Sequence, residues 1–340
     1  MAPSTNTRIV RAKYVARGDS FTHENFRTET VPLDHNLKEG DVLIRNIYLA
    51  LDPYTRFSFE SPAPTLGQTV VGYGLGEVVE SKNAAYPVSS IVVGHNFGWE
   101  QYTLQSNPRV LFVVPDAQNS KVDLTEFVNA LGMNGLTAYA AAETLAKFHK
   151  DQKIYVSSAA GPVGTLFALL AKRAGAFVIG SAGSDDKVQY LLKDIGLDAA
   201  FNYKTQDTRA QLDAAAPDGI DIYFDLVGGE TLDIALEKLK NSGKVIAVGN
   251  LSVVNGKTPY LTKNLHLIVL KALTINGFST FPHYQKFPEF WRKFVPLVAS
   301  GEFKTQKPTV IQGLENAGQA YADYFDGKYK GKVAVQVSAV

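Results

Sequence analysis

The chain has 340 residues, with 34 lysines and arginines against 33 aspartates and glutamates, and it contains no cysteine. The near-neutral charge argues against a nucleic-acid or membrane-surface partner, and the absence of cysteine excludes disulfides, thiolate nucleophiles and cysteine-ligated zinc. The length is enough for two domains, and because neither the first residues nor the apolar run from Leu265 resembles a signal peptide or a membrane span, we expect a cytoplasmic protein.

Residues 1–128 carry short apolar runs separated by Gly, Pro, Asn and Asp. These runs are rich in Val, Ile and Tyr, and include DVLIRNIYLALD, GQTVVGYGLGEVVES, SSIVVGHNFGWEQYTLQ and RVLFVVP. Short runs of β-branched and aromatic residues with turn residues between them are typical of strands. The sequence therefore predicts a β-rich, partly barrel-like domain here.

From Leu131 onward, helical segments alternate with continuous apolar strands. The predicted strands are 153–160, 176–182, 199–203, 219–227, 243–251 and 273–280. Strands without polar alternation are buried on both faces, which is typical of a parallel sheet covered by helices on each side. The predicted fold class is therefore α/β, with a six-stranded, Rossmann-type, doubly wound sheet.

The segment beyond the sixth strand predicts two amphipathic helices and a final strand. Its sequence runs FPEFWRKFVPLVASGEF and then GLENAGQAYADYFDGKYKGKVAVQV. We expect this segment to return to the first domain. The predicted division is a catalytic (substrate) domain of residues 1–128 and 302–340, into which a dinucleotide-binding domain of residues 129–301 is inserted.

A glycine-rich turn, SSAAGPVG, follows the first strand of the predicted sheet. Its spacing is Ala159-x-Gly161-x-x-Gly164, directly before a long helix. Such a turn lets backbone approach a pyrophosphate, and the helix N-terminus offers N–H groups and a positive dipole end to its charge. The alternative is a purely structural turn, but the strand before, the helix after and a second βα unit favour dinucleotide binding.

The end of the second strand selects between NAD and NADP. NAD-binding folds place a carboxylate there for the ribose 2′-OH, whereas this strand runs into Gly183, Ser184 and, one turn later, Lys187. The hydroxyl and the ammonium suit a 2′-phosphate. Asp185 and Asp186 fit the first turn of a helix capped by Ser184, and Lys187 could equally be a solvated helix lysine. The balance favours NADPH over NADH.

Motifs along almost the whole chain are similar to those of one enzyme family. They are LALDPYTR, GYGLGEVVES, ALGMNGLTAYAA, AAGPVG, GSAGSDDK, FNYK, GIDIYFDLVGGE, KNL and GKVAVQV. They resemble the zinc-free branch of the medium-chain dehydrogenase/reductase superfamily, and within it the prostaglandin reductases, leukotriene dehydrogenases and plant alkenal double-bond reductases. The resemblance implies a Rossmann domain inserted in a GroES-like domain, a homodimer formed through the edge of the sixth strand, and no metal.

The resemblance also implies an activity and the residues that carry it. The family transfers hydride from NADPH to the β-carbon of an α,β-unsaturated aldehyde or ketone, and the α-carbon takes a proton. Tyr54 would be the catalytic residue facing the nicotinamide and substrate, Lys187 would bind the 2′-phosphate, and Phe278 would approach the carboxamide. The implied cofactor-binding residues are Ala159, Gly161, Val163, Gly164, Gly183, Ser184, Lys187, Tyr203, Val227, Gly249, Phe278 and Ser279. The implied substrate pocket comprises Tyr54, Val254, Phe281 and Tyr284.

Three residues depart from the family pattern on the cofactor side. Val254 stands where a tyrosine is common, Leu226 replaces a frequent asparagine, and Tyr329 holds another position where asparagine is usual. These changes keep two alternatives open. One is an NADPH quinone oxidoreductase of the same zinc-free branch, and the other is a non-catalytic NADPH-binding protein.

Several candidate side chains have an ordinary structural interpretation as well. Tyr54 could be a packed core residue, with a bound water as the proton donor instead. Phe281 and Tyr284 could pack within the protein rather than line a pocket. The six histidines have no short metal-ligand spacing, and we interpret His95, in VVGHNFGW, as a loop or surface histidine.

Overall fold

The computed structural model describes residues 3–16, 18–60, 66–117, 121–254 and 260–340. The chain divides into two compact units. Unit 1 comprises residues 1–133 and 291–340, and unit 2 comprises residues 134–290. The second division falls within helix α9 (Phe287–Ala299), so the domain boundaries expected from the sequence, near residues 129 and 301, stay a prediction.

Unit 2 is built on a six-stranded sheet in which every pairing is parallel. Its strands are β8 (Lys153–Val156), β9 (Phe177–Ala182), β10 (Ala199–Asn202), β11 (Ile220–Asp225), β12 (Leu239–Ala247) and β13 (Thr274–Gly277). The spatial order is β10-β9-β8-β11-β12-β13. The predicted doubly wound parallel sheet is confirmed, and its direction of winding changes between β8 and β11, where such folds bind their ligands.

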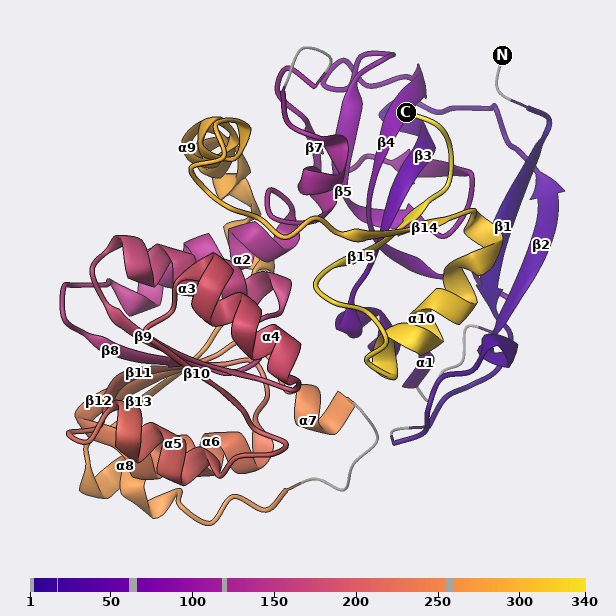
Figure 1. The fold of residues 1–340 in the computed structure, drawn as a ribbon. Helices are drawn as coiled ribbons and strands as arrows, with labels where there is room; N and C mark the ends of the chain where they lie inside the picture. Colours follow the sequence, from indigo (N-terminus) through magenta and orange to yellow (C-terminus); the bar gives the residue numbers. More distant parts are fainter. Residues whose placement is uncertain (1–2, 17, 61–65, 118–120, 255–259) are drawn as a thin grey trace. The chain divides into compact units, whose positions relative to one another are not determined.

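Helices cover both faces of this sheet. They are α2 (Met133–Ala141), α3 (Pro162–Arg173), α4 (Asp185–Tyr190), α5 (Thr208–Ala215), α6 (Gly229–Lys238), α7 (Leu251–Val254) and α8 (His266–Leu270). In Figure 1, α2, α3 and α4 lie on one face, and α5, α6 and α8 lie on the other. Under them the apolar runs of the strands form the core, with Tyr155 stacked on Tyr223 and Phe167 stacked on Phe224.

Unit 1 is β-rich. Its strands are β1 (Thr5–Arg11), β2 (Phe26–Pro32), β3 (Asp41–Leu51), β4 (Val71–Ser81), β5 (Ile91–Gly98), β6 (Tyr102–Ser106), β7 (Leu111–Val113), β14 (Thr309–Gln312) and β15 (Val333–Gln336). Strands β14-β15-β3-β4-β5-β7 form one path of a seven-stranded sheet, with β6 added beside β3, and β1 pairs with β2. Helices α1 (Phe57–Glu60) and α10 (Ala317–Phe325) belong to this unit.

The core of unit 1 joins the two ends of the chain. Strand β15 pairs antiparallel with β3, with Ala334 opposite Ala50. The fully buried Trp99 stacks on Phe26 and meets Tyr321 of α10 edge to face, at ring-centroid distances of 5.7 and 5.4 Å. The C-terminal segment therefore completes the β-rich unit that the N-terminal segment begins.

Candidate functional site

The glycine turn after β8 has the geometry of a close backbone approach. Ser158 adopts a positive φ of 50°, and the Gly161 N–H donates to its carbonyl at 2.9 Å. Gly161 occupies the N-cap of the twelve-residue helix α3, and Pro162 is its first residue. Proline is suited to this position because its missing N–H has no carbonyl to serve within the helix.

Gly164 is required by the packing of α3 against the turn. A Cβ on Gly164 would lie 2.5 Å from the Ser158 carbonyl oxygen and 2.9 Å from the Ala159 Cα. On Gly161 the nearest atom would be 3.2 Å away, so the earlier glycine is less constrained by the protein itself. Thr165 closes the turn by donating to the Ala159 carbonyl at 2.8 Å. The turn is therefore packed closely against α3, and its contact with a dinucleotide pyrophosphate stays a prediction.

A buried carboxylate fixes the turn that follows β11. Asp225 accepts hydrogen bonds from the Tyr223 hydroxyl at 2.8 Å and from the backbone N–H groups of Val227 and Gly228 at 3.0 and 2.7 Å. Burial raises the pKa of Asp225, while these donors oppose the shift. Asp225 thus holds the β11 turn in one conformation at the point where the sheet changes its winding.

Ser157 links the turn after β8 to the turn after β11. Its hydroxyl accepts from the Leu226 N–H at 3.0 Å, and its oxygen lies 3.1 Å from the Tyr223 hydroxyl oxygen. Leu226 is buried, and a Cβ on Gly249 would lie 2.9 Å from the Leu226 carbonyl oxygen. The family resemblance implied that Val227 and Gly249 bind the cofactor, and Leu226 was one of the three departures from the family pattern. All three residues lie together at the carboxyl ends of β11 and β12. Sequence reasoning assigned no role to Ser157 or Asp225.

The carboxyl end of β9 contains no acid. The strand stops at Ala182, and a Cβ on Gly183 would lie 3.2 Å from the Tyr203 hydroxyl and 3.3 Å from Lys204 Cε. Tyr203 therefore flanks the turn as expected from the family, and Lys204 is a second cationic side chain there that the sequence analysis did not assign. Lys187 is half-buried in α4.

One of the two acids in the first turn of α4, Asp185, has a structural role. Asp185 accepts a hydrogen bond from the Asn202 side chain at 2.7 Å, which ties α4 to β10. Ser184 occupies the N-cap of α4, but its side chain makes no capping hydrogen bond. The predicted side-chain cap is therefore wrong, although Asp185 and Asp186 do lie in the first turn of the helix.

The residues predicted at the nicotinamide end lie beyond β12 and β13. The Phe278 N–H donates to the Ala247 carbonyl at 2.8 Å, and its ring stacks on His283 at 5.0 Å. Ser279 follows Phe278 directly.

Two of the predicted substrate-pocket residues, Tyr284 and Phe281, differ in exposure. Tyr284 is 3% exposed, with its ring next to those of Phe281 and Phe287, whereas Phe281 is 57% exposed. Packing thus accounts for Tyr284. The side chain of Val254, the last residue of α7, lies outside the described part of the chain.

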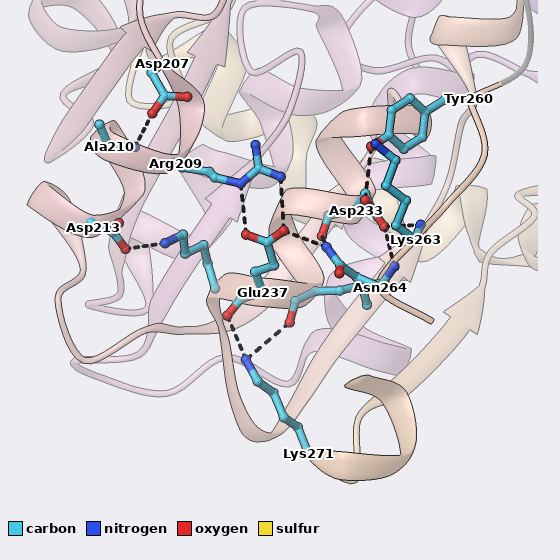
Figure 2. Close-up of polar contacts among 12 residues, drawn as sticks. Asp207, Arg209, Ala210, Asp213, Asp233, Glu237, Tyr260, Lys263, Asn264 and Lys271 are labelled. Atoms are coloured by element: carbon cyan, nitrogen blue, oxygen red, sulfur yellow. Dashed lines mark hydrogen bonds and ion pairs between the residues drawn. The ribbon is translucent and has the colours of Figure 1, made fainter. Parts of the chain in front are cut away.

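A polar network on α6 fixes the KNL segment (Figure 2). Asp233, 1% exposed, accepts from the backbone N–H groups of Lys263 and Asn264 at 2.9 and 2.8 Å and from the Tyr260 hydroxyl at 3.1 Å. The Glu237 carboxylate accepts hydrogen bonds from the Asn264 side chain at 2.6 Å and from the Arg209 guanidinium. The hydrogen bond from Arg209 lowers the pKa of Glu237.

Lys271 completes this network at the end of α6. Its ammonium donates to the carbonyls of Leu236, Glu237 and Leu239, at 3.3, 2.7 and 2.8 Å. A cation at the C-terminus of a helix is favoured by the helix dipole and by the unsatisfied carbonyls there. The KNL motif therefore anchors the segment after α7 to α6.

Tyr54 lies in unit 1, on a 3₁₀ turn (Pro53–Arg56) that follows β3. Its hydroxyl is 3.3 Å from Nδ1 of His95, on β5. His95 is 5% exposed, so the expectation of a loop or surface histidine is wrong. His95 lies within β5 (Ile91–Gly98), most of whose residues are buried.

Asp52 fixes the start of the Tyr54 turn. Its carboxylate forms an ion pair with the ammonium of Lys332, and both residues are buried. Lys332 also donates to the Leu51 carbonyl at 3.2 Å, and the Tyr321 hydroxyl donates to the Asp52 carbonyl at 3.2 Å. Burial lowers the pKa of Lys332. This pair thus holds the backbone directly before Tyr54.

Tyr329, the third departure from the family pattern, also lies in unit 1. Its hydroxyl donates to Asp323 at 3.4 Å, and its ring packs on the core of that unit. The hydrogen bond to Asp323 and the packing of the ring explain how unit 1 holds a tyrosine at this position.

Neither a metal site nor a membrane span is found in the residues described above. Within those ranges, no three His, Asp or Glu side chains gather so as to hold a metal ion. Within the same ranges, every helix is too short or too polar to cross a membrane.

The comparisons with known proteins agree with this geometry. A family model described as N-terminal domain of oxidoreductase matches residues 15–114, and one described as Zinc-binding dehydrogenase matches residues 162–299. The NADP(+)-dependent 2-alkenal reductase of Nicotiana tabacum is 34% identical over 98% of this chain and 98% of its own.

Two further relatives support the same placement. Prostaglandin reductase 1 of Bos taurus is 33% identical over 93% of this chain and 94% of its own. The crystal structure of CurA from Vibrio vulnificus in complex with NADPH has a TM-score of 0.87 at 28% identity, covering 98% of this chain and 100% of that one. The chain therefore belongs to the zinc-free medium-chain dehydrogenase/reductase family, together with the alkenal double-bond and prostaglandin reductases.

Proposed function

We propose that this protein is an NADPH-dependent reductase of the carbon–carbon double bond of α,β-unsaturated aldehydes and ketones. The main observation in support is at the carboxyl ends of β8 and β9. A packed glycine turn follows β8, and the end of β9 has no acid, with Lys204 beside it and Lys187 in the helix α4 that follows. The names of the relatives, an NADP-dependent alkenal reductase and a prostaglandin reductase, support the same substrate class. We further propose that the reaction needs no metal and that the protein is cytoplasmic, as the absence of cysteine would suit.

The proposed site residues have separate roles in cofactor binding and in proton transfer. NADPH, when bound, supplies the hydride that goes to the β-carbon. In unit 2, the turn at Gly161 and Gly164 would hold the pyrophosphate, and Gly183, Ser184, Lys187 and Tyr203 the 2′-phosphate end. The carboxyl ends of β11, β12 and β13 would face the nicotinamide. Tyr54, the proposed catalytic residue, would donate the proton that the α-carbon takes up as the enolate collapses.

An assay of NADPH oxidation tests this function. We expect turnover with a medium-chain 2-alkenal or enone, with the saturated carbonyl as the product, and preference for NADPH over NADH. The Tyr54→Phe variant should lose 10²-fold or more in kcat, on the order of general acid catalysis. Turnover of quinones alone would favour the quinone oxidoreductase, and NADPH binding with no turnover would favour the non-catalytic alternative.

We also propose that the protein is a homodimer. Strand β13 ends the unit 2 sheet and pairs there with β12 alone among the described strands. Next to it, Val269 and Leu270 on α8 are 83% and 74% exposed, and Ile275 is 39% exposed. An edge strand beside exposed apolar side chains is a surface that a second chain can cover.

Light scattering after size exclusion tests this assembly. We expect the mass of two chains for the wild type and of one chain for Val269→Glu combined with Leu270→Glu. Val88→Glu is the matched control, since Val88 is 56% exposed but lies in unit 1. A wild-type mass of one chain would refute the proposal.

A further inference from the structure

The contact between Tyr54 and His95 is the starting point. Tyr54 Oη lies 3.3 Å from His95 Nδ1, and the two rings are 5.6 Å apart. The backbone of His95 is fixed on both sides, because its N–H donates to the Val110 carbonyl at 3.1 Å and its carbonyl accepts from Gln105 at 3.0 Å. The imidazole is thus held by a packed strand rather than by a loop.

The surroundings of His95 make it neutral at pH 7. Burial lowers the pKa of His95 to about 4, and the nearby Asp52 carboxylate opposes that shift only in part. Asp52 is itself paired with Lys332. On the other side, the buried Tyr73 of β4 meets the His95 ring edge to face at 5.3 Å. The titratable and charged groups that the described contacts place near His95 include Tyr54, Tyr73, Asp52 and, through Asp52, Lys332.

A neutral imidazole carries one proton, and its position decides what Tyr54 can do. If Nε2 carried the proton, Nδ1 would accept the Tyr54 hydrogen, and the Tyr54 hydroxyl would donate to His95 rather than to a substrate. If Nδ1 carries it, the imidazole donates to Tyr54 Oη, and His95 does not take up the Tyr54 hydrogen. Only the second arrangement suits a proton donor.

We propose that His95 carries its proton on Nδ1 and is a positioning residue that orients the Tyr54 hydroxyl toward the substrate and stabilises the phenolate that the reaction leaves. This inference rests on the proposed function, with Tyr54 as the proton donor. Sequence reasoning assigned no such role to His95.

The proton balance of the step is simple. The β-carbon gains a hydride, the electrons of the double bond move onto the carbonyl oxygen, and the resulting enolate takes the Tyr54 proton at its α-carbon. The O–H bond of Tyr54 breaks and a C–H bond forms. Tyr54 is left as a phenolate that accepts the His95 Nδ1–H, which stays on nitrogen, and water then returns a proton to Tyr54.

The tautomer can be measured without turnover. In protein labelled with ¹⁵N-histidine and saturated with NADP⁺, long-range ¹H–¹⁵N spectra at pH 7 distinguish Nδ1–H from Nε2–H imidazole. The protein has six histidines, and the His95 signals are those missing from the His95→Asn variant. We expect the Nδ1–H form, and an Nε2–H form would overturn the proposal.

Kinetics of three variants test the coupling to Tyr54. His95→Leu should lower kcat about tenfold or more, as expected for a lost hydrogen bond to a charged acceptor, and should move the alkaline limb of the kcat profile to higher pH. His95→Asn, whose amide can donate from about the position of Nδ1, should restore kcat to within a few fold. In Tyr54→Phe, adding His95→Leu should change kcat less than twofold. Additive losses with an unmoved pH profile would mean a merely structural role and would overturn the proposal.

The two readouts separate the failure of this proposal from failure of the proposed function. A wild type that reduces no enone, with His95 in the Nδ1–H form, refutes the function. Enone reduction with His95 in the Nε2–H form refutes the role of His95. The affinity for NADPH, measured by cofactor fluorescence, should stay unchanged in the His95 variants because His95 is not one of the proposed cofactor-binding residues.

Discussion

Replacing Lys187 with alanine is expected to raise the KM for NADPH about 10- to 100-fold and to leave the KM for NADH within about twofold. A charge-assisted hydrogen bond to a phosphate contributes about 1.5–3 kcal/mol, which is the source of that range. NADH lacks the 2′-phosphate and so cannot lose this interaction. The measurement is steady-state oxidation of each cofactor with one enone at saturating concentration.

Lys193→Ala is the matched control for this experiment. Lys193 is exposed in the turn Leu191–Ile195 that continues α4, and its loss should change neither KM. Lys204→Ala adds a comparison, because Lys204 lies as close to Gly183 as Tyr203 does and should produce an intermediate loss for NADPH. Equal effects of Lys187→Ala on the two cofactors would show that α4 does not select the 2′-phosphate.

Replacing Lys332 with methionine is expected to destabilise unit 1 by about 3–5 kcal/mol, the usual cost of leaving one member of a buried ion pair uncompensated. Lys332 and Asp52 are 3% and 4% exposed, so water cannot solvate the remaining carboxylate. Urea unfolding followed by tryptophan fluorescence reports on this unit alone, because both tryptophans, Trp99 and Trp291, belong to unit 1.

Two further variants define the cause of that loss. Lys332→Met combined with Asp52→Asn should recover much of the stability, because no unpaired charge then remains buried. Lys330→Met, an exposed position two residues earlier, should change the unfolding free energy by less than about 0.5 kcal/mol. A loss in the double variant as large as in Lys332→Met would attribute the effect to packing instead of charge.

The sheet of unit 2 could be predicted because its signals are local. Each strand is a continuous apolar run such as KIYV or IDIYFD, and each run is followed by turn residues and an amphipathic helix. The glycine turn was predictable for the same reason, since Gly161 and Gly164 act within a few residues of the strand that precedes them.

Other features depend on contacts far apart in the sequence. Strand β14 was missed because its four residues, three of them half-buried and one exposed, gain their pairing from β15, more than twenty positions later. Helix α8 was not predicted, because only two of its five residues, Leu267 and Ile268, pack against the core of unit 2. His95 was misjudged because its burial depends on neighbours from β4 and the Tyr54 turn. Asp225 and Ser157 look ordinary in sequence, and only the fold shows that they join two turns.

The division of unit 1 between the two ends of the chain has a consequence for biosynthesis. A nascent chain that has left the ribosome as far as residue 300 contains all of unit 2, but it lacks β14, β15 and α10. Domains generally fold as they emerge from the ribosome. The nucleotide-binding unit can therefore reach its native state before β15 has been synthesised and has paired with β3. Until then the buried surface of Leu49 and Leu51 is exposed, and this interval is when the chain most depends on chaperones.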